Sequence, residues 1–115
     1  LGVAGFRIDA AKHMAPEDIG AIVAGMPAGT RIYQEVIRGL SEPIQPEQYA
    51  ANGPVWEFTY ARTLKSMIDS GRLNPDVVFG PEGGSLPSGS AISFVDNHDT
   101  ERNGETLSYA DGERY

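Results

Sequence analysis

The sequence predicts an α/β fold with a parallel β-sheet, because segments typical of strands and helices alternate along its 115 residues. The helical segments carry apolar side chains spaced three or four residues apart, and the strand segments are short apolar runs near glycine and proline residues. Parallel sheets bind ligands beyond the carboxyl ends of their strands. The side chains at those ends therefore indicate what the protein could bind.

The first part of the chain is expected to form a strand, a helix and a second strand. The first strand is predicted over residues 3–9. Pro16 and the acids after it indicate a helix start, since proline suits the first helical position and acids suit the positive end of the helix dipole. One face of this helix should cover the sheet, with an apolar stripe formed by Ile19, Ile22, Val23 and Met26. A strand over 30–37 then completes a right-handed βαβ unit.

The second part repeats the alternation. Residues 41–54 are expected to be a loop, followed by a strand over 55–59 and a helix over 60–70. Glycine and proline predict another loop over 74–89, before a last strand over 91–96. No repeat or linker divides the chain, so we expect a single domain or part of one.

Composition limits the possible partners. The chain has 9 Lys and Arg against 16 Asp and Glu, a formal net charge of −7, which argues against nucleic acid and against an anionic membrane surface. No apolar stretch approaches the roughly 18 residues of a membrane span. The absence of cysteine excludes disulfides, thiolate metal sites and cysteine nucleophiles. A neutral or cationic small ligand fits this composition best.

Acidic side chains end three of the four predicted strands. These strand ends carry Asp9, Glu35 and the cluster of Asp96, His98 and Asp99. Arg7 precedes Asp9 by two residues, so both side chains lie on one face of the first strand. Alone, that pair would most simply be a structural ion pair. Three acids on three strands of one sheet are costly to bury unless they are paired or used, and so they favour a shared functional site.

Three segments resemble signature segments of the α-amylase family of glycoside hydrolases. They are residues 5–13 (GFRIDAAKH), 33–36 (YQEV) and 94–99 (FVDNHD), and the continuation 100–104 (TERNG) is similar to secreted amylases of actinobacteria and animals. The resemblance implies a partial (β/α)8 TIM barrel, approximately its strands four to seven with the intervening helices. Residues 1–115 would then be an interior fragment of the catalytic domain, without the N-terminal strands, the eighth strand and the C-terminal β-domain.

The family performs endo-acting, retaining hydrolysis of α-1,4-glucosidic bonds in starch and related α-glucans. The resemblance makes Asp9 the nucleophile, Glu35 the general acid/base and Asp99 the transition-state stabiliser. The residues themselves agree: neighbouring strands lie about 4.8 Å apart, near the roughly 5–5.5 Å between the carboxyl groups of retaining glycosidases. Arg7 would keep Asp9 ionised, whereas Glu35 has no cation beside it in sequence and could carry the proton.

Further site residues are implied by the resemblance alone. The expected substrate-binding residues are Arg7, Lys12, His13, His98 and Glu57. Of these, His98 matches a histidine that hydrogen-bonds the sugar beside the scissile bond, and Lys12 and His13 match residues on the product side of the cleft. For Glu57, an exposed acid at a strand end with no role in binding is an equal alternative.

Two ions are also implied by the resemblance. The backbone carbonyl of His13 resembles a calcium ligand, one of the six to eight oxygens that Ca²⁺ prefers. Arg7 and Asn97 match two ligands of a chloride site found in animal-type amylases. The third chloride ligand would lie beyond Tyr115, which leaves chloride dependence open.

Several broader expectations and alternatives follow. The resemblance implies a starch or malto-oligosaccharide substrate, secretion and a monomer, and we expect the 115-residue piece to be inactive alone because open strand edges and half a barrel are a poor scaffold. Another α-glucan-active member, an α-glucosidase or a transglycosylase, is the main alternative. A non-catalytic sugar-binding relative is a second. A metallophosphoesterase, suggested by the Asn-His-Asp run at 97–99, would need more histidines than the chain has.

Overall fold

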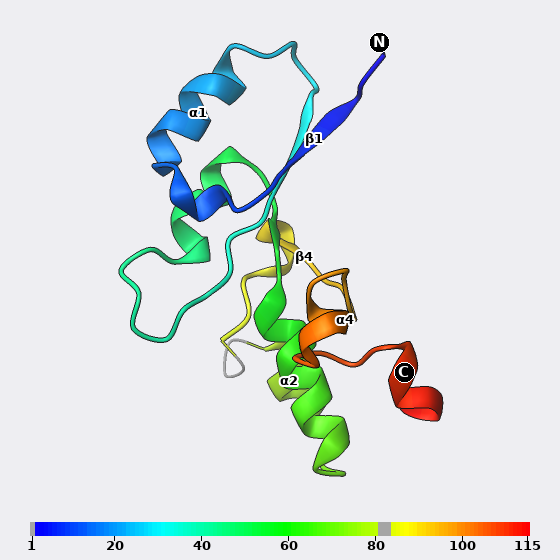
Figure 1. Ribbon diagram of the computed structural model, residues 1–115. Coiled ribbons are helices and arrows are strands. Elements are labelled where there is room, and N and C mark those ends of the chain that lie inside the picture. Colours follow the sequence, from blue (N-terminus) through cyan, green and yellow to red (C-terminus); the bar gives the residue numbers. More distant parts are fainter. Residues whose placement is uncertain (1, 81–83) are drawn as a thin grey trace. The chain divides into compact units, whose positions relative to one another are not determined.

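The computed structural model describes residues 2–80 and 84–115. The chain divides into two compact units, which are described separately: unit 1 comprises Leu1–Trp56 and Ser88–Ile92, and unit 2 comprises Glu57–Pro87 and Ser93–Tyr115. Figure 1 shows the path of the chain through its helices and strands. No helix within the described ranges is long and apolar enough to cross a membrane.

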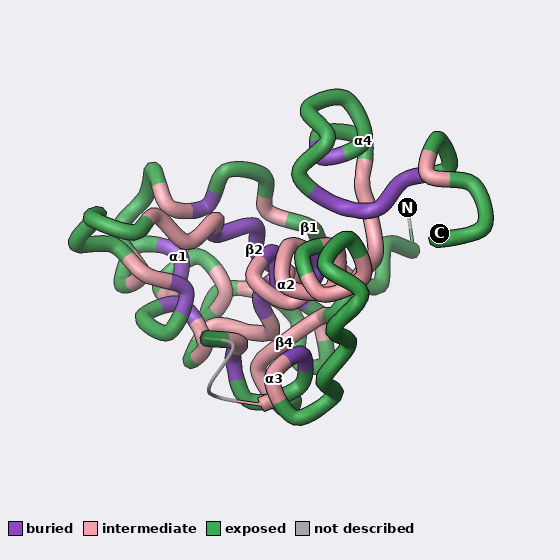
Figure 2. The backbone as a smooth tube through the Cα atoms, turned by 90° about the horizontal axis from the view of Figure 1, so that it is seen from below, coloured by how far each residue is buried: buried purple, intermediate pink, exposed green. Residues whose placement is uncertain are grey.

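Unit 1 holds a parallel four-stranded sheet in the order β1-β2-β3-β4. The strands are β1 (Gly5–Ile8), β2 (Arg31–Gln34), β3 (Val55–Trp56) and β4 (Ala91–Ile92). Spatial order equals chain order, as in consecutive βα units, so the predicted parallel α/β sheet is confirmed. Its best buried part runs along β2 into the following residues (Figure 2).

The helices of unit 1 are mostly short. They are η1 (Ala11–His13), α1 (Pro16–Ala24), η2 (Pro46–Asn52) and η4 (Ser88–Ser90), of which only α1 is an α-helix. Helix α1 begins at Pro16 as predicted and packs against η2. The approach is close at Gly20, where an added Cβ would lie 2.9 Å from Asn52 Oδ1.

The predicted apolar stripe of α1 is only partly correct. Ile19 is buried, but Ile22 is 52% exposed. Helix α1 packs mainly on the short helix η2, and this contact leaves Ile22 largely uncovered.

Unit 2 is built around α2. Its helices are α2 (Phe58–Asp69), α3 (Pro75–Phe79), α4 (Thr100–Asn103) and η5 (Tyr109–Arg114). The Phe58 ring packs edge-on against Phe94 with centroids 4.9 Å apart, and Ala61 is fully buried on the same helix. These contacts form an apolar centre under the first turns of α2.

Several predicted boundaries are wrong in the second half. The strands predicted over 55–59 and 91–96 end at Trp56 and Ile92, and α2 begins two residues earlier than expected. The third strand is short because the Glu57 side chain accepts a hydrogen bond from the Thr59 amide and starts the helix there. Short helices also occupy both predicted loops, and residues 81–83 of the second loop lie outside the described residues.

Candidate active site

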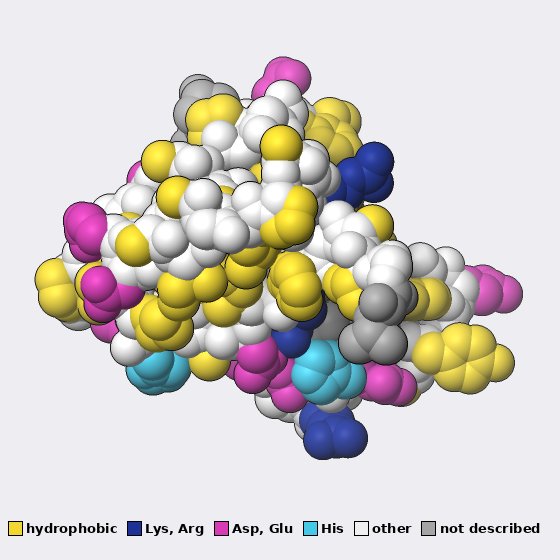
Figure 3. All heavy atoms as spheres, turned by 90° about the horizontal axis from the view of Figure 1, so that it is seen from above, with side chains coloured by type: hydrophobic (Ala, Val, Ile, Leu, Met, Phe, Trp, Pro, Cys, Tyr) yellow, Lys and Arg dark blue, Asp and Glu magenta, His cyan; other side chains and the backbone are white. Residues whose placement is uncertain are grey.

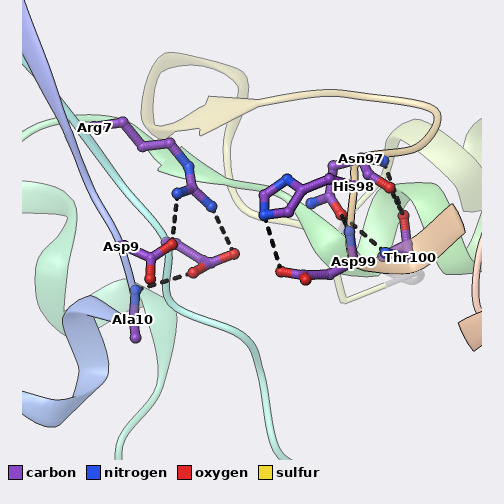
Figure 4. Close-up of polar contacts among 8 residues, drawn as sticks. Arg7, Asp9, Ala10, Asn97, His98, Asp99 and Thr100 are labelled. Carbon is purple, nitrogen blue, oxygen red and sulfur yellow. Dashed lines mark hydrogen bonds and ion pairs between the residues drawn. The ribbon is translucent and has the colours of Figure 1, made fainter. Parts of the chain in front are cut away.

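Arg7 joins Asp9 and Glu35 at the carboxyl ends of β1 and β2. Its Nη1 donates a hydrogen bond to Asp9 Oδ1 at 2.6 Å, and its Nη2 donates to Glu35 Oε1 at 2.9 Å (Figure 4). Ile8 pairs with Gln34 in the β1–β2 register, so Asp9 and Glu35 are the next residues on two adjacent strands. One guanidinium therefore bridges two carboxylates that are 26 positions apart in sequence.

Glu35 is far more buried than Asp9. The Glu35 side chain is 7% exposed, and its Oε2 accepts a hydrogen bond from the Ala10 amide at 2.9 Å. Its backbone is fixed on both sides, because its N–H donates to Ile8 O and its carbonyl accepts from the Ala11 amide, each at 2.9 Å. The Asp9 side chain is 72% exposed. Glu35 is thus held in place, while Asp9 is open to a ligand.

Glu35 has a cation beside it in space although it has none beside it in sequence. Arg7 reaches it from the neighbouring strand at 2.9 Å. The two residues are 28 positions apart, so local sequence gives no sign of the contact. The assignment of the general acid now depends on the family resemblance and not on a difference in nearby charge.

Ala10 has an unusual backbone conformation beside this pair. Its φ of 44° and ψ of 41° lie in the left-handed region, and it is the one non-glycine residue with positive φ in the ranges that the structure describes. Such a conformation costs about 1–2 kcal/mol for a residue with a Cβ and often marks a functional site. Here it aims the Ala10 amide at Glu35. No side-chain pattern could have identified Ala10 from the sequence.

A small pocket lies next to Glu35. It has a volume of about 90 Å³ and is lined by Ala10, Lys12, His13, Glu35 and Ile37. Lys12 Nζ forms an ion pair with Glu42 Oε2 at 2.7 Å. His13 is exposed, and Figure 3 shows histidine side chains (cyan) at the molecular surface. The structure thus brings Lys12, His13 and Glu35 together in one pocket.

Unit 2 carries the remaining predicted residues. The side-chain oxygen of Asn97 accepts hydrogen bonds from the amides of Asp99 at 3.0 Å and Thr100 at 2.9 Å, and so fixes the turn that leads into α4 (Figure 4). His98 Nε2 lies 3.4 Å from Asp99 Oδ2, with the two side chains 62% and 54% exposed. His98 and Asp99 therefore present polar groups to solvent from this turn.

Glu57 is 3% exposed, so the alternative prediction of an exposed acid at a strand end is wrong. Its Oε1 accepts from the Thr59 amide at 2.9 Å and its Oε2 accepts from the Leu86 amide at 2.6 Å. Both oxygens of the buried carboxylate thus accept a main-chain hydrogen bond within unit 2, and substrate binding by Glu57 stays a prediction. Glu57 caps α2 and fixes the loop at Leu86.

The two ions that the resemblance implies stay predictions. Within the described residues no group of three or more His, Asp or Glu side chains could hold a metal. Arg7 has five N–H donors and Asn97 a side-chain amide, both suited to an anion. Arg7 lies in unit 1 and Asn97 in unit 2.

No family model matches the chain. Individual proteins do: an α-amylase of Streptomyces violaceus is 47% identical over 116 residues, which cover 100% of this chain and 20% of that protein. An α-amylase of Hypothenemus hampei is 42% identical, over 100% of this chain and 26% of its own length. The chain belongs to the α-amylase family.

Solved α-amylase structures extend this result to the fold. α-Amylase I of Eisenia fetida matches with a TM-score of 0.85 and 35% identity, covering 99% of this chain and 27% of that one. A mutant of the same enzyme in complex with maltohexaose matches with a TM-score of 0.86 and 33% identity. The predicted partial (β/α)8 barrel is therefore confirmed, and the chain spans between 20% and 27% of the length of these relatives.

Proposed function

We propose that the complete protein containing this chain is an α-amylase that hydrolyses α-1,4-glucosidic bonds in starch and related α-glucans, by endo-action and with retention of configuration. The observation that carries the proposal is the Arg7 bridge between Asp9 and Glu35, in a segment homologous to α-amylases. The maltohexaose complex of a related enzyme supports an α-glucan as substrate.

The adjacent carboxylates support a two-step mechanism. Asp9 attacks the anomeric carbon while Glu35 gives its proton to the leaving oxygen, and Glu35 then takes a proton from the water that releases the sugar. The contacts with Arg7 and Ala10 stabilise the carboxylate that Glu35 becomes after the first proton transfer. Retention is favoured because Asp9 and Glu35 continue one register on neighbouring strands, about 4.8 Å apart.

The other predicted residues have supporting roles in this proposal. Asp99 would stabilise the positive charge of the transition state and His98 would bind the sugar, and both are exposed enough to meet a ligand. Lys12 and His13 would bind the part of the glucan on the product side of the cleft. Their pocket of about 90 Å³ is smaller than the roughly 300–1,000 Å³ of usual ligand pockets, which suits one wall of a longer cleft.

Calcium, chloride and location complete the proposal. The His13 carbonyl would supply one calcium ligand and other parts of the protein the rest, so a chelator should lower the melting temperature of the complete protein. Arg7 and Asn97 would contribute to a chloride site, which a chloride-free activity assay tests. We also propose, from the resemblance, that the protein is secreted and monomeric.

The decisive experiment replaces Glu35 by Gln in the complete protein. We expect the kcat on soluble starch to fall by about 10²–10⁴-fold, because the proton donor is lost. Glu113→Gln, at an exposed position on η5, is the matched control, and circular dichroism checks folding. Near-normal turnover would remove Glu35 as the general acid.

Product analysis separates the alternatives. Endo-action gives an early fall in iodine staining with mixed oligosaccharides, and NMR of fresh product should show the α-anomer. Glucose released alone from chain ends would indicate an α-glucosidase instead. Binding of malto-oligosaccharides without any cleavage would indicate a non-catalytic relative.

A further inference from the structure

Two buried polar side chains connect β2 with η2 next to Glu35 in sequence. Gln34 and Tyr49 are both 0% exposed. Gln34 Nε2 donates hydrogen bonds to Tyr49 O at 3.0 Å and to Gly53 O at 2.8 Å, and so holds η2 and the turn after it against β2. Gln34 immediately precedes Glu35, so the same short stretch of β2 supplies both the proposed acid and this anchor.

Helix η2 in turn holds the segment between η1 and α1. The Tyr49 hydroxyl donates to Met14 O at 2.7 Å, and Asn52 Nδ2 donates to Pro16 O at 2.7 Å. Met14 is the C-cap of η1 and Pro16 is the first residue of α1. We call Gln34, Tyr49 and Asn52, with these four hydrogen bonds to backbone carbonyls, the η2 brace.

The turn at Gly53 leaves this arrangement little freedom. Gly53 has a φ of 146°, and an added Cβ would lie 2.5 Å from Ile32 O on β2. The main-chain N–H of Gln34 also donates a hydrogen bond to Pro54 O at 3.0 Å, next to the contact of its side chain with Gly53 O. Buried polar groups are costly when they lose their partners, so the brace specifies one position of η2 on β2.

The consequence of the brace reaches Glu35 through η1. Helix η1 begins at Ala11, and Ala10 is its N-cap. The Ala10 amide donates to Glu35 Oε2 and the Ala11 amide donates to Glu35 O. Ala10 is in the left-handed conformation, which persists only where the surroundings hold it. The brace fixes the far end of this three-residue helix at Met14, and so restricts how the Ala10 end can move.

We infer that the η2 brace positions the Ala10 amide on Glu35 and sets Lys12 and His13 in the pocket, which makes Tyr49 a positioning residue. The catalytic consequence rests on the function proposed above. Burial raises the pKa of the Tyr49 phenol, and the charge of Glu17 adds to this effect. The hydroxyl therefore stays a hydrogen-bond donor through the neutral and mildly alkaline range.

The test is Tyr49→Phe in the complete protein, since phenylalanine keeps the ring and removes only the hydroxyl. Hydrogen exchange of the Ala10 and Ala11 amides should become faster by about tenfold, because one anchoring hydrogen bond is lost. We expect kcat/KM on malto-oligosaccharides to fall by about tenfold well below the melting temperature, with kcat lowered, since small misplacements of catalytic groups reduce the rate steeply. Tyr109→Phe, at a position 84% exposed, is the control and should change neither readout.

The outcomes separate the possible roles. A lower melting temperature with unchanged amide exchange and unchanged kcat would overturn the inference and leave Tyr49 a purely structural residue. If Tyr49→Phe does not fold, Asn52→Ala decides the question by the same two readouts, because it removes the second anchor from a half-buried position. If the parent protein cleaves no α-glucan, the proposed function fails while the amide exchange still decides the brace.

Discussion

Different kinds of contact stabilise the interior of unit 1 and the C-terminal segment of unit 2. In unit 1, the buried side chains of Gln34 and Tyr49 donate directional hydrogen bonds to main-chain carbonyls. In unit 2, α2 is tied to the C-terminal segment by charge pairs with exposed or half-buried members, Arg62–Glu105, Lys65–Asp111 and Arg114–Asp69. Exposed pairs contribute about 0–1 kcal/mol each and are screened by salt. The Gln34 and Tyr49 contacts should therefore resist salt, whereas the charge pairs between α2 and the C-terminal segment should be sensitive to it.

The same difference separates the proposed catalytic acids. Glu35 is 7% exposed and both of its carboxylate oxygens accept hydrogen bonds, from Arg7 and from the Ala10 amide. Asp99 is 54% exposed, and its neighbour His98 lies 3.4 Å away. One acid is preorganised by its own strand pair, and the other must be oriented by a ligand or by further contacts. Substitutions of Glu35 should thus change geometry, and those of Asp99 should mainly change charge.

The largest expected difference is between two arginine substitutions. Arg7→Met leaves the buried Glu35 carboxylate without its cation, and we expect a loss of about 2 kcal/mol in unfolding free energy, less than for a fully buried pair because Arg7 is one-third exposed. Hydrolysis should also fall strongly, since both proposed catalytic carboxylates lose their common partner. Urea unfolding and starch hydrolysis of the complete protein measure the two effects.

Arg62→Met is the matched control for Arg7→Met. Arg62 pairs with Glu105 at the surface of unit 2, with side chains 36% and 40% exposed, so its loss should cost less than about 1 kcal/mol and leave kcat unchanged. Equal losses for the two variants would contradict the distinction between the units.

A smaller effect is expected at Glu57. Glu57→Gln keeps one carbonyl oxygen but presents an amide to one of the two main-chain donors, so we expect a loss of about 1 kcal/mol in unfolding free energy. The KM for malto-oligosaccharides should not change, because the side chain is buried. Glu101→Gln, at an exposed position of α4, serves as the control. A raised KM at unchanged stability would restore Glu57 as a subsite residue.

Part of this arrangement could be predicted from the sequence. The alternation of side chains along a strand places Arg7 and Asp9 on one face, and the order of parallel strands places Asp9 beside Glu35. Both arguments need only periodicity and topology. The contact of Arg7 with Glu35 depends in addition on how far the Arg7 side chain extends from β1 to β2. The spacing of residues along the sequence does not predict that distance.

Helix starts were harder to predict where the apolar pattern is continuous. Val55, Trp56 and Phe58 form an apolar run that is typical of a strand. The N-cap at Glu57 is recognised only from its hydrogen bond with the Thr59 amide. The region of η2 did contain a usable signal. Gln45 and Gln48 flank Pro46 and form a reciprocal capping box, which the proline-rich composition obscured.

The smallest expected effect concerns the pH response of Asp111 at the C-terminal segment. The Ser108 amide donates to Asp111 Oδ2 at 2.8 Å and lowers the pKa of that carboxyl, and Lys65 and Arg114 add to the effect. Because the folded pKa lies below the ordinary value of about 3.9, the stabilisation is complete above about pH 4 and is lost as the pH falls through the folded pKa. The NMR shift of the Ser108 amide should therefore stay constant down to about pH 4 and change below it. Because the largest cause is a hydrogen bond and not a distant charge, this behaviour should persist in high salt, while Asp111→Asn should abolish it. A transition at the ordinary aspartate pKa, or one that salt removes, would show that charge and not a directional contact holds Asp111 in the C-terminal segment.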